Sequence, residues 1–183
     1  LVAAIIVAIG LFVLLPFFIS EKLYKIVPSI QLRGLIEGVI RVALFVGYVK
    51  AISLLEDIRR VFMYHGAEHK CINCIENGME LTVENAKKQT MVHKRCGTSF
   101  MLVVMFVSIL LFMFISVPNM WVRMVLRILL IPVIAGISFE FISLAGKSEN
   151  PVINVLSKPG LWLQALTTRE PDDSMLEVAI SSV

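Results

Sequence analysis

The stretch SFMLVVMFVSILLFMFISV, residues Ser99–Val117, decides the fold because it contains no charged side chain. An α-helix needs about 20 apolar residues to cross the hydrocarbon core of a bilayer. The stretch Leu1–Ile19 is equally free of charge and is interrupted only by Gly10 and Pro16. We therefore expect both stretches to be membrane-spanning helices.

The composition also indicates a membrane protein. Of the 183 residues, 57% are hydrophobic and 17% are charged, against roughly 45–50% and about 25% in ordinary soluble domains. With a mean hydropathy of +0.84, polar surface is too scarce to cover a soluble globule, which argues against a soluble enzyme domain and a disordered segment. The net charge is only +3 and the basic residues are dispersed, so we expect no nucleic-acid partner.

The start of the chain lies inside an apolar run and is Leu1 rather than Met. We expect it to be part of a longer protein. The first 19 positions have neither the basic start nor the small-residue cleavage site of a signal peptide.

Two further apolar segments, Leu32–Leu55 and Met124–Ala145, contain a few charges, and we expect them to span the membrane as well. Glu140 lies within the second of them. An acid at that depth is expected to face the interior of a helix bundle and to have a partner there, for which Arg41 is the candidate. A structural ion pair and a functional relay both stay open for Glu140.

The first of these charged segments has a polar face. Arg33, Glu37 and Arg41 are four residues apart, so on a helix they lie on one side, where the acid can pair with a base. Gly34 and Gly38 form a small-xxx-small step beside them, which lets another helix come close. The pattern predicts a polar seam packed against a neighbouring helix.

The basic residues outside the predicted helices set the orientation. Most of them lie in the central segment and in the C-terminal tail, which favours the cytoplasm for both. Cysteines there stay reduced and are available as metal ligands. We therefore divide the chain into transmembrane helices 1 and 2 (residues 1–55), a cytoplasmic His/Cys metal-binding insertion (56–98), transmembrane helices 3 and 4 (99–145) and a cytoplasmic tail (146–183).

Short helices are expected in the two cytoplasmic parts. Asn77 and Gly78 are expected to end one helix, and Thr82 to cap the start of another. In the tail, PDDSMLEVAI predicts an amphipathic helix that docks on its own protein. We expect three prolines to break the tail elsewhere: Pro151, Pro159 and Pro171.

The chemistry concentrates between His65 and Cys96, which enclose all three histidines and all three cysteines. On a helix, His65 and His69 point the same way and can reach one metal ion, and Glu68 borders the same face. Inverzincin metalloproteases use this H-x-x-E-H order, with the acid as general base. The downstream HKRC stretch offers His93 and Cys96 as further ligands.

A second scheme uses the same region differently. Cys71-x2-Cys74 followed by His93-x2-Cys96 fits a structural Cys3His zinc site with no open coordination position. Both schemes need His93 and Cys96. Cys71 and Cys74 can instead be small buried hydrophobic residues, and the residues alone leave the choice open.

At these motifs the sequence resembles the YqhQ-like family of bacterial integral membrane proteins, which is described as a domain of unknown function and as metal-dependent enzymes. The resemblance implies a polytopic bacterial membrane protein with a metal site and no established substrate. The family pattern covers the positions of His65, Glu68, His69, His93 and Cys96, and it does not require cysteine at the other two positions, which favours the mixed His/Cys site. The matching stretches are EGVIR (Glu37–Arg41), YHGAEHK (Tyr64–Lys70), HKRCGTSF (His93–Phe100), TTREPDD (Thr167–Asp173) and EVAI (Glu177–Ile180).

We therefore expect an all-α polytopic membrane protein of a bacterial cell membrane, with about four transmembrane helices and a helical cytoplasmic metal-binding insertion between helices 2 and 3. Zinc, or another divalent metal, is the expected cofactor because imidazole and thiolate suit it. The lipid bilayer is the expected partner, with a homo-oligomer or other membrane subunits as further candidates.

Three functions compete. The first is a membrane-bound metal-dependent hydrolase in which Glu68 takes the proton of a metal-activated water. The second is a non-enzymatic membrane scaffold with a structural zinc site. The third is part of a transporter, which would use Glu37, Arg41 and Glu140 within the bilayer.

Overall fold

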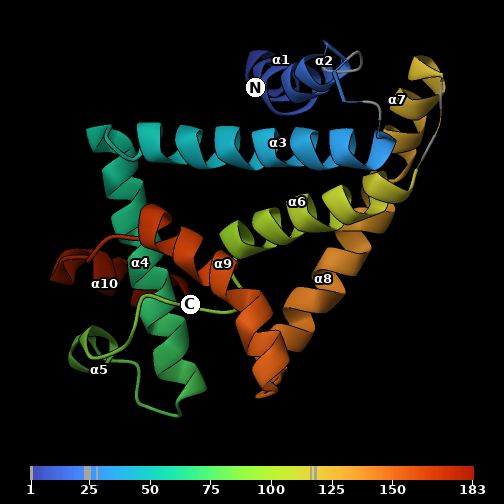
Figure 1. The fold of residues 1–183 in the computed structure, drawn as a ribbon. Coiled ribbons are helices and arrows are strands. Elements are labelled where there is room, and N and C mark those ends of the chain that lie inside the picture. The colour runs from blue at the N-terminus through green and yellow to red at the C-terminus, as the bar shows by residue number, and fades with distance from the viewer. Residues whose placement is uncertain (1, 23–25, 28, 116, 118) are drawn as a thin grey trace. The chain divides into compact units, whose positions relative to one another are not determined.

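Every regular element in the described part of the chain is a helix, which confirms the expected all-α class (Figure 1). The computed structural model describes residues 2–22, 26–27, 29–115, 117 and 119–183. They form two compact units. The first unit consists of Leu1–Gly47 and Phe100–Ser143, and the second of Tyr48–Ser99 and Leu144–Val183.

The first unit holds most of the apolar helices, several of them with breaks. They are α1 (Val2–Ile9), the π-helical η1 (Gly10–Leu14), α2 (Leu15–Lys22), most of α3 (Ile30–Ile52), most of α6 (Gly97–Phe114), α7 (Met120–Leu129) and most of α8 (Ile131–Lys147). The expected helix Met124–Ala145 is interrupted, because the chain breaks between α7 and α8, which together form a bent pair. Pro132 lies just beyond this break, and it has no N–H to continue the hydrogen bonds of the preceding helix.

One helix in the described part of the chain, α6, is long and apolar enough to cross a membrane by its length and composition. It corresponds to the stretch Ser99–Val117. The number rises to three only when α3 with α4, and α7 with α8, are each counted as one bent span.

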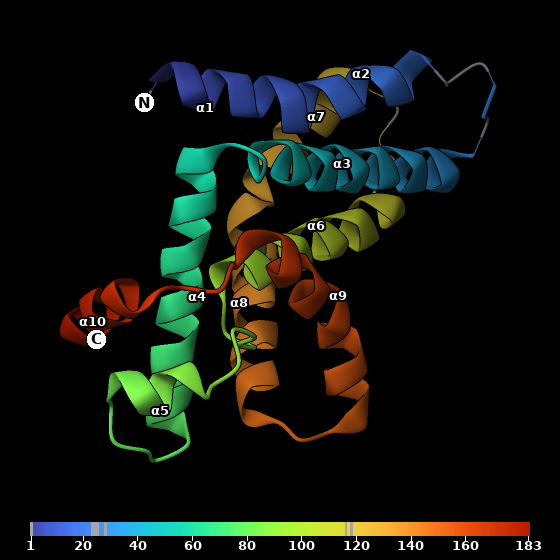
Figure 2. The same cartoon turned by 90° about the vertical axis from the view of Figure 1, so that its left-hand side faces the viewer.

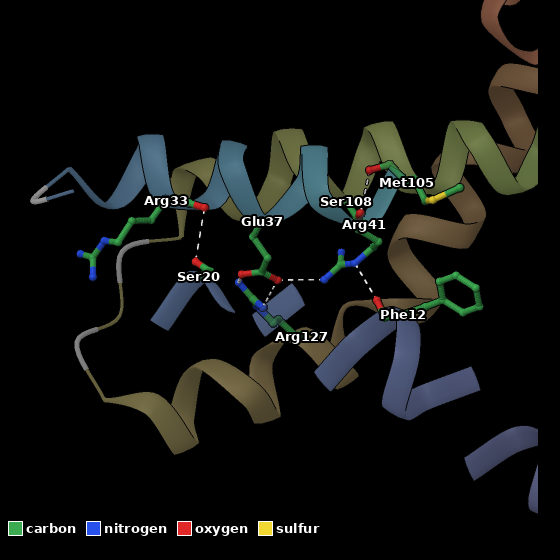
Figure 3. A network of polar contacts seen from close by, with 8 residues as sticks. All are labelled: Phe12, Ser20, Arg33, Glu37, Arg41, Met105, Ser108 and Arg127. Carbon is green, nitrogen blue, oxygen red and sulfur yellow. Dashed lines mark hydrogen bonds and ion pairs between the residues drawn. The ribbon is translucent and has the colours of Figure 1, made fainter. Parts of the chain in front are cut away.

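The π-helical segment η1 is linked to α3 through the main-chain carbonyl of Phe12. The Nε of Arg41 donates to this carbonyl at 3.0 Å (Figure 3). Arg41 thus links α3 to the irregular turn at Gly10–Leu14.

Glu37 lies at the centre of a buried ion-pair network in the first unit (Figure 3). Arg41 donates to its carboxylate at 2.8 Å, which confirms the pairing predicted from the four-residue spacing. From α7, Arg127 donates to both carboxylate oxygens, with 2.9 Å between Nη2 and Oε2. The expected pairing of Arg41 with Glu140 is wrong, because Arg41 is engaged here and Glu140 is exposed on α8.

The glycine step on α3 brings α6 close, as predicted. A Cβ placed on Gly38 would overlap the side chain of Ile109, and one on Gly34 would touch the backbone of Met113 at 3.7 Å. The polar seam of α3 is therefore packed against neighbouring helices.

The second unit contains α4 (Glu56–Glu76), α5 (Val83–Lys87), α9 (Pro151–Thr167) and α10 (Asp173–Ser182), with the adjoining ends of α3, α6 and α8. As expected, α4 ends before Gly78, which has a φ of 68°, and Thr82 caps α5 by accepting from the Asn85 N–H. The expectation that Pro151 breaks the tail is wrong. Pro151 is in the first turn of α9, where no helical N–H is needed, and Pro159 lies inside the same helix.

The core of the second unit forms where α10 lies against α4 and α5 (Figure 2). Ala67 and Cys71 of α4 pack there with Met175, Leu176 and Ala179 of α10. The docking predicted for this amphipathic helix is confirmed.

The segment between α9 and α10 is fastened along α4. The Arg169 N–H donates to the Phe62 carbonyl at 2.9 Å, and Glu170 pairs with Lys70 at 2.8 Å. A Cβ on Gly66 would overlap the Arg169 carbonyl oxygen. Glycine at this position therefore permits the close approach of the two segments.

We predict that Gly66→Ala lowers the free energy of unfolding by about 1–3 kcal/mol, because the added methyl group pushes the segment at Arg169 away from α4. Thermal unfolding of the purified protein in detergent measures this change. Gly47→Ala is the matched control, since nothing lies within 4 Å of a Cβ there. Equal melting temperatures for the two variants would contradict the packing described.

We predict that Glu37→Gln costs about 3–5 kcal/mol of stability, because it leaves two arginines without the carboxylate that they share. Glu140→Gln, on an exposed side chain of α8, should change stability by no more than about 0.5 kcal/mol. Denaturant titration in mixed micelles compares the two variants. A loss at Glu140 as large as that at Glu37 would refute the network as the main polar contact of this unit.

Candidate metal centre

Three side chains in the second unit direct ligand atoms at one point. His65 and His69 lie on successive turns of α4, and Cys96 directly precedes α6. The two imidazole centroids are 4.3 Å apart. One ligand atom from each of the three side chains lies within 4.8 Å of the other two. This is the only group of its kind among the described residues.

Both imidazoles are oriented by backbone carbonyls. His65 Nδ1 lies 2.8 Å from the Thr167 carbonyl oxygen, and His69 Nδ1 lies 2.6 Å from that of Met91. A carbonyl can only accept, so in each ring Nδ1 carries the proton. Each Nε2 then remains for another interaction, as in metal-binding histidines, whose second nitrogen is held by an outer partner.

Cys96 is buried and faces these rings. Its Sγ lies 3.2 Å from His65 Nε2 and 3.2 Å from the Thr98 hydroxyl. Burial raises the pKa of the thiol, but hydrogen bonds from His65, His69 and Thr98 outweigh it and lower the pKa to about 5. The hydrogen bond with Cys96 in turn raises the pKa of His65. These hydrogen bonds favour the thiolate form of Cys96, which is the form that binds metal ions.

His93 lies beside this cluster with its ring turned to another partner. Its Nε2 is 3.3 Å from a carboxylate oxygen of Glu76, and its ring centroid is 5.8 Å from that of His69. The buried Gln164 accepts from the His93 N–H at 2.9 Å and donates to the His93 carbonyl at 2.6 Å. These two backbone bonds fix the position of the HKRC stretch.

The remaining predicted site residues lie outside the three-residue cluster. Glu68 is exposed on α4, one turn from His65, and its charge helps to raise the pKa of that histidine. Cys71 is enclosed in the core against α10, where burial raises its pKa. The Cys74 thiol donates to the Glu80 carbonyl at 3.4 Å. The four residues of the Cys3His scheme are thus not brought together.

Sequence reasoning missed the groups that position the ligands. The carbonyls of Thr167 and Met91 hold the imidazoles, and Gln164 holds the loop. Every residue has a backbone carbonyl, so the residue type does not indicate which carbonyls bond to the histidines. The buried amide of Gln164, in an otherwise apolar stretch of α9, is the one detectable signal.

A family model described as "Protein of unknown function (DUF1385)" matches residues 1–183. The chain is 42% identical over 172 residues to a Bacillus subtilis (strain 168) protein named "Uncharacterized protein YqhQ". This match covers 93% of the chain and 54% of the relative, so the chain spans about half of that protein's length. No solved structure matches the chain.

Proposed function

The chain belongs to the DUF1385 family of proteins of unknown function, and for this member we propose a membrane-bound, metal-dependent hydrolase. The observation that carries the proposal is the convergence of His65, His69 and Cys96, whose two imidazoles are already oriented by carbonyls. Two imidazoles and a thiolate suit zinc better than the hard cations, which prefer oxygen ligands. Zinc, or another divalent metal, is therefore the proposed cofactor.

Three ligands favour catalysis over a purely structural role. Structural zinc sites have four protein ligands, whereas catalytic sites have three and leave one position for water or substrate. When bound, zinc supplies a Lewis acid and lowers the pKa of a water to about 7. Glu68 borders the ligand face of α4 and is exposed, so it is available to accept the proton of the attacking water.

The proposal that the protein lies in a membrane is supported by the exposed apolar surface of α6. Helix α6 is apolar enough to span a bilayer, and it exposes large side chains such as Phe106, Leu110 and Phe114. Exposed apolar patches of this kind mark contacts with lipid or protein. We propose a multi-pass protein of the bacterial membrane, with the metal centre on the cytoplasmic side because basic residues are concentrated in that part of the chain.

A structural zinc site is the second candidate, and His93 is the observation that favours it. Its ring is 5.8 Å from that of His69. If it left Glu76, it would complete a four-ligand site of His65, His69, His93 and Cys96. The protein would then be a membrane scaffold without metal chemistry.

We predict that the purified protein binds about one zinc ion per chain, and that His65→Ala, His69→Ala and Cys96→Ser each abolish this stoichiometric binding because each removes a ligand. Elemental analysis of protein dialysed against trace zinc measures the content. Cys71→Ala and Cys74→Ala are the matched controls and should keep the ion. Loss of zinc from these controls, with retention in His65→Ala, would overturn the proposed centre. In His93→Gln, retained zinc favours the three-ligand site and lost zinc the four-ligand one.

We predict that Glu68→Gln retains zinc but lowers the turnover number by about 10²–10⁴-fold, as expected for loss of a general base. Hydrolysis of a panel of p-nitrophenyl carboxylate and phosphate esters, with and without a chelator, provides the measurement. Glu84→Gln, which removes an exposed acid from α5, should leave the rate unchanged. Chelator-sensitive hydrolysis that Glu68→Gln does not slow would exclude Glu68 as the base.

A further inference from the structure

A cleft of about 240 Å³ lies in the second unit, beside the HKRC stretch. His93, Lys94 and Arg95 all line it, and the next residue is the ligand Cys96. Four consecutive residues therefore serve two sites, with three at the cleft and one at the metal cluster. The ring centroid of His93, which lines the cleft, is 5.8 Å from that of the ligand His69.

Lys94 is the distinctive group in this cleft. Its side chain is half-buried, and its Nζ donates to the Asn154 side-chain oxygen at 2.9 Å and to the Ser148 carbonyl at 3.4 Å. Neither oxygen is charged, and no carboxylate lies within ion-pair distance of Lys94 in the described part of the chain. A partly buried ammonium held only by neutral oxygens lacks the counter-charge that normally offsets desolvation.

Arg95 adds a second cation, which is positioned by packing. A Cβ on Gly146 would overlap the Arg95 side chain, so the glycine allows the arginine to lie against α8. The guanidinium is bonded to Glu76, which also contacts His93. Lys94, Arg95 and Glu76 are all lining residues of the cleft, and their formal charges sum to a net positive charge.

We propose that this cleft binds a phosphate group, with Lys94 as its main contact and Arg95 as the second. A phosphate monoester carries about −1.5 to −2 charges at neutral pH, enough to balance Lys94 and to compete with Glu76 for Arg95. A carboxylate carries a single charge and satisfies Lys94 alone. Arginine also binds phosphate through two parallel N–H bonds.

This inference rests on the proposed function and narrows it, because a phosphate beside the metal centre makes the substrate a phosphate-bearing molecule. The phosphate belongs either to a free solute or to a lipid headgroup. The metal centre would act on a bond near the bound phosphate, while Lys94 and Arg95 hold the group in place.

The test is isothermal titration calorimetry on the full chain in neutral detergent, with inorganic phosphate as the probe. We expect saturable binding that Lys94→Gln weakens at least tenfold and that Lys94→Arg largely restores. Lys88→Gln, which removes an exposed charge at the C-cap of α5 outside the cleft, should change affinity less than twofold. The absence of saturable binding, or equal losses in Lys94→Gln and Lys88→Gln, would overturn the inference.

Two further experiments distinguish a lipid headgroup from a free phosphate, and phosphate binding in the cleft from binding at the metal centre. Dihexanoyl phosphatidic acid that competes better than inorganic phosphate, while dihexanoyl glycerol does not compete, supports a lipid headgroup; equal competition supports a free phosphate. Repeating the titration after chelation separates the cleft from the metal. If chelation of zinc abolishes phosphate binding and Lys94→Gln leaves it unchanged, the proposed phosphate site in the cleft is refuted. If instead the protein binds no zinc but binds phosphate in a Lys94-dependent way, the phosphate site is supported and the proposed hydrolase is refuted.

Discussion

The hydrogen bond from His65 Nδ1 to the Thr167 carbonyl is the contact on which the candidate site depends. It joins α4, which supplies two of the three ligand side chains, to the end of α9, which lies about 100 residues later in the sequence. Several contacts keep the two partners in register: the Arg169 N–H on the Phe62 carbonyl, the pair of Lys70 with Glu170, and the packing of α10 on α4. The C-terminal segment from Thr167 through α10 therefore fixes the orientation of the His65 imidazole toward Cys96.

The sequence predicts His65, His69 and Cys96 as ligands, and helix geometry explains why Cys71 is not one of them. His65 and His69 are four residues apart and share a face, whereas Cys71 is about 200° around the helix axis from His69. That rotation directs Cys71 to α10, where it joins the apolar core. The place of His93 could not be read from its spacing to Cys96, because the buried Gln164 fixes its backbone and Glu76 takes its ring.

In the first unit, too, contacts between residues close in sequence could be predicted, whereas contacts between distant helices could not. The pair of Glu37 and Arg41 follows from their spacing, but Arg127 comes from a helix far along the chain, so the sequence gives no sign of it. The expected pairing of Arg41 with Glu140 is wrong because Arg41 bonds to Glu37 and to the Phe12 carbonyl instead. Prolines were the least predictable residues: one lies just beyond a helix break, one begins a helix and one lies inside a helix.

The claim that His65, His69 and Cys96 form a metal centre is tested most directly by X-ray absorption spectroscopy of the zinc-loaded chain. The account predicts one sulfur ligand at about 2.3 Å, with imidazole nitrogens at about 2.0–2.1 Å. Two or three sulfur ligands would contradict it, because they would require Cys71 or Cys74 to leave the core. A spectrum without imidazole ligands would contradict it equally, because the two anchored histidines are its main support.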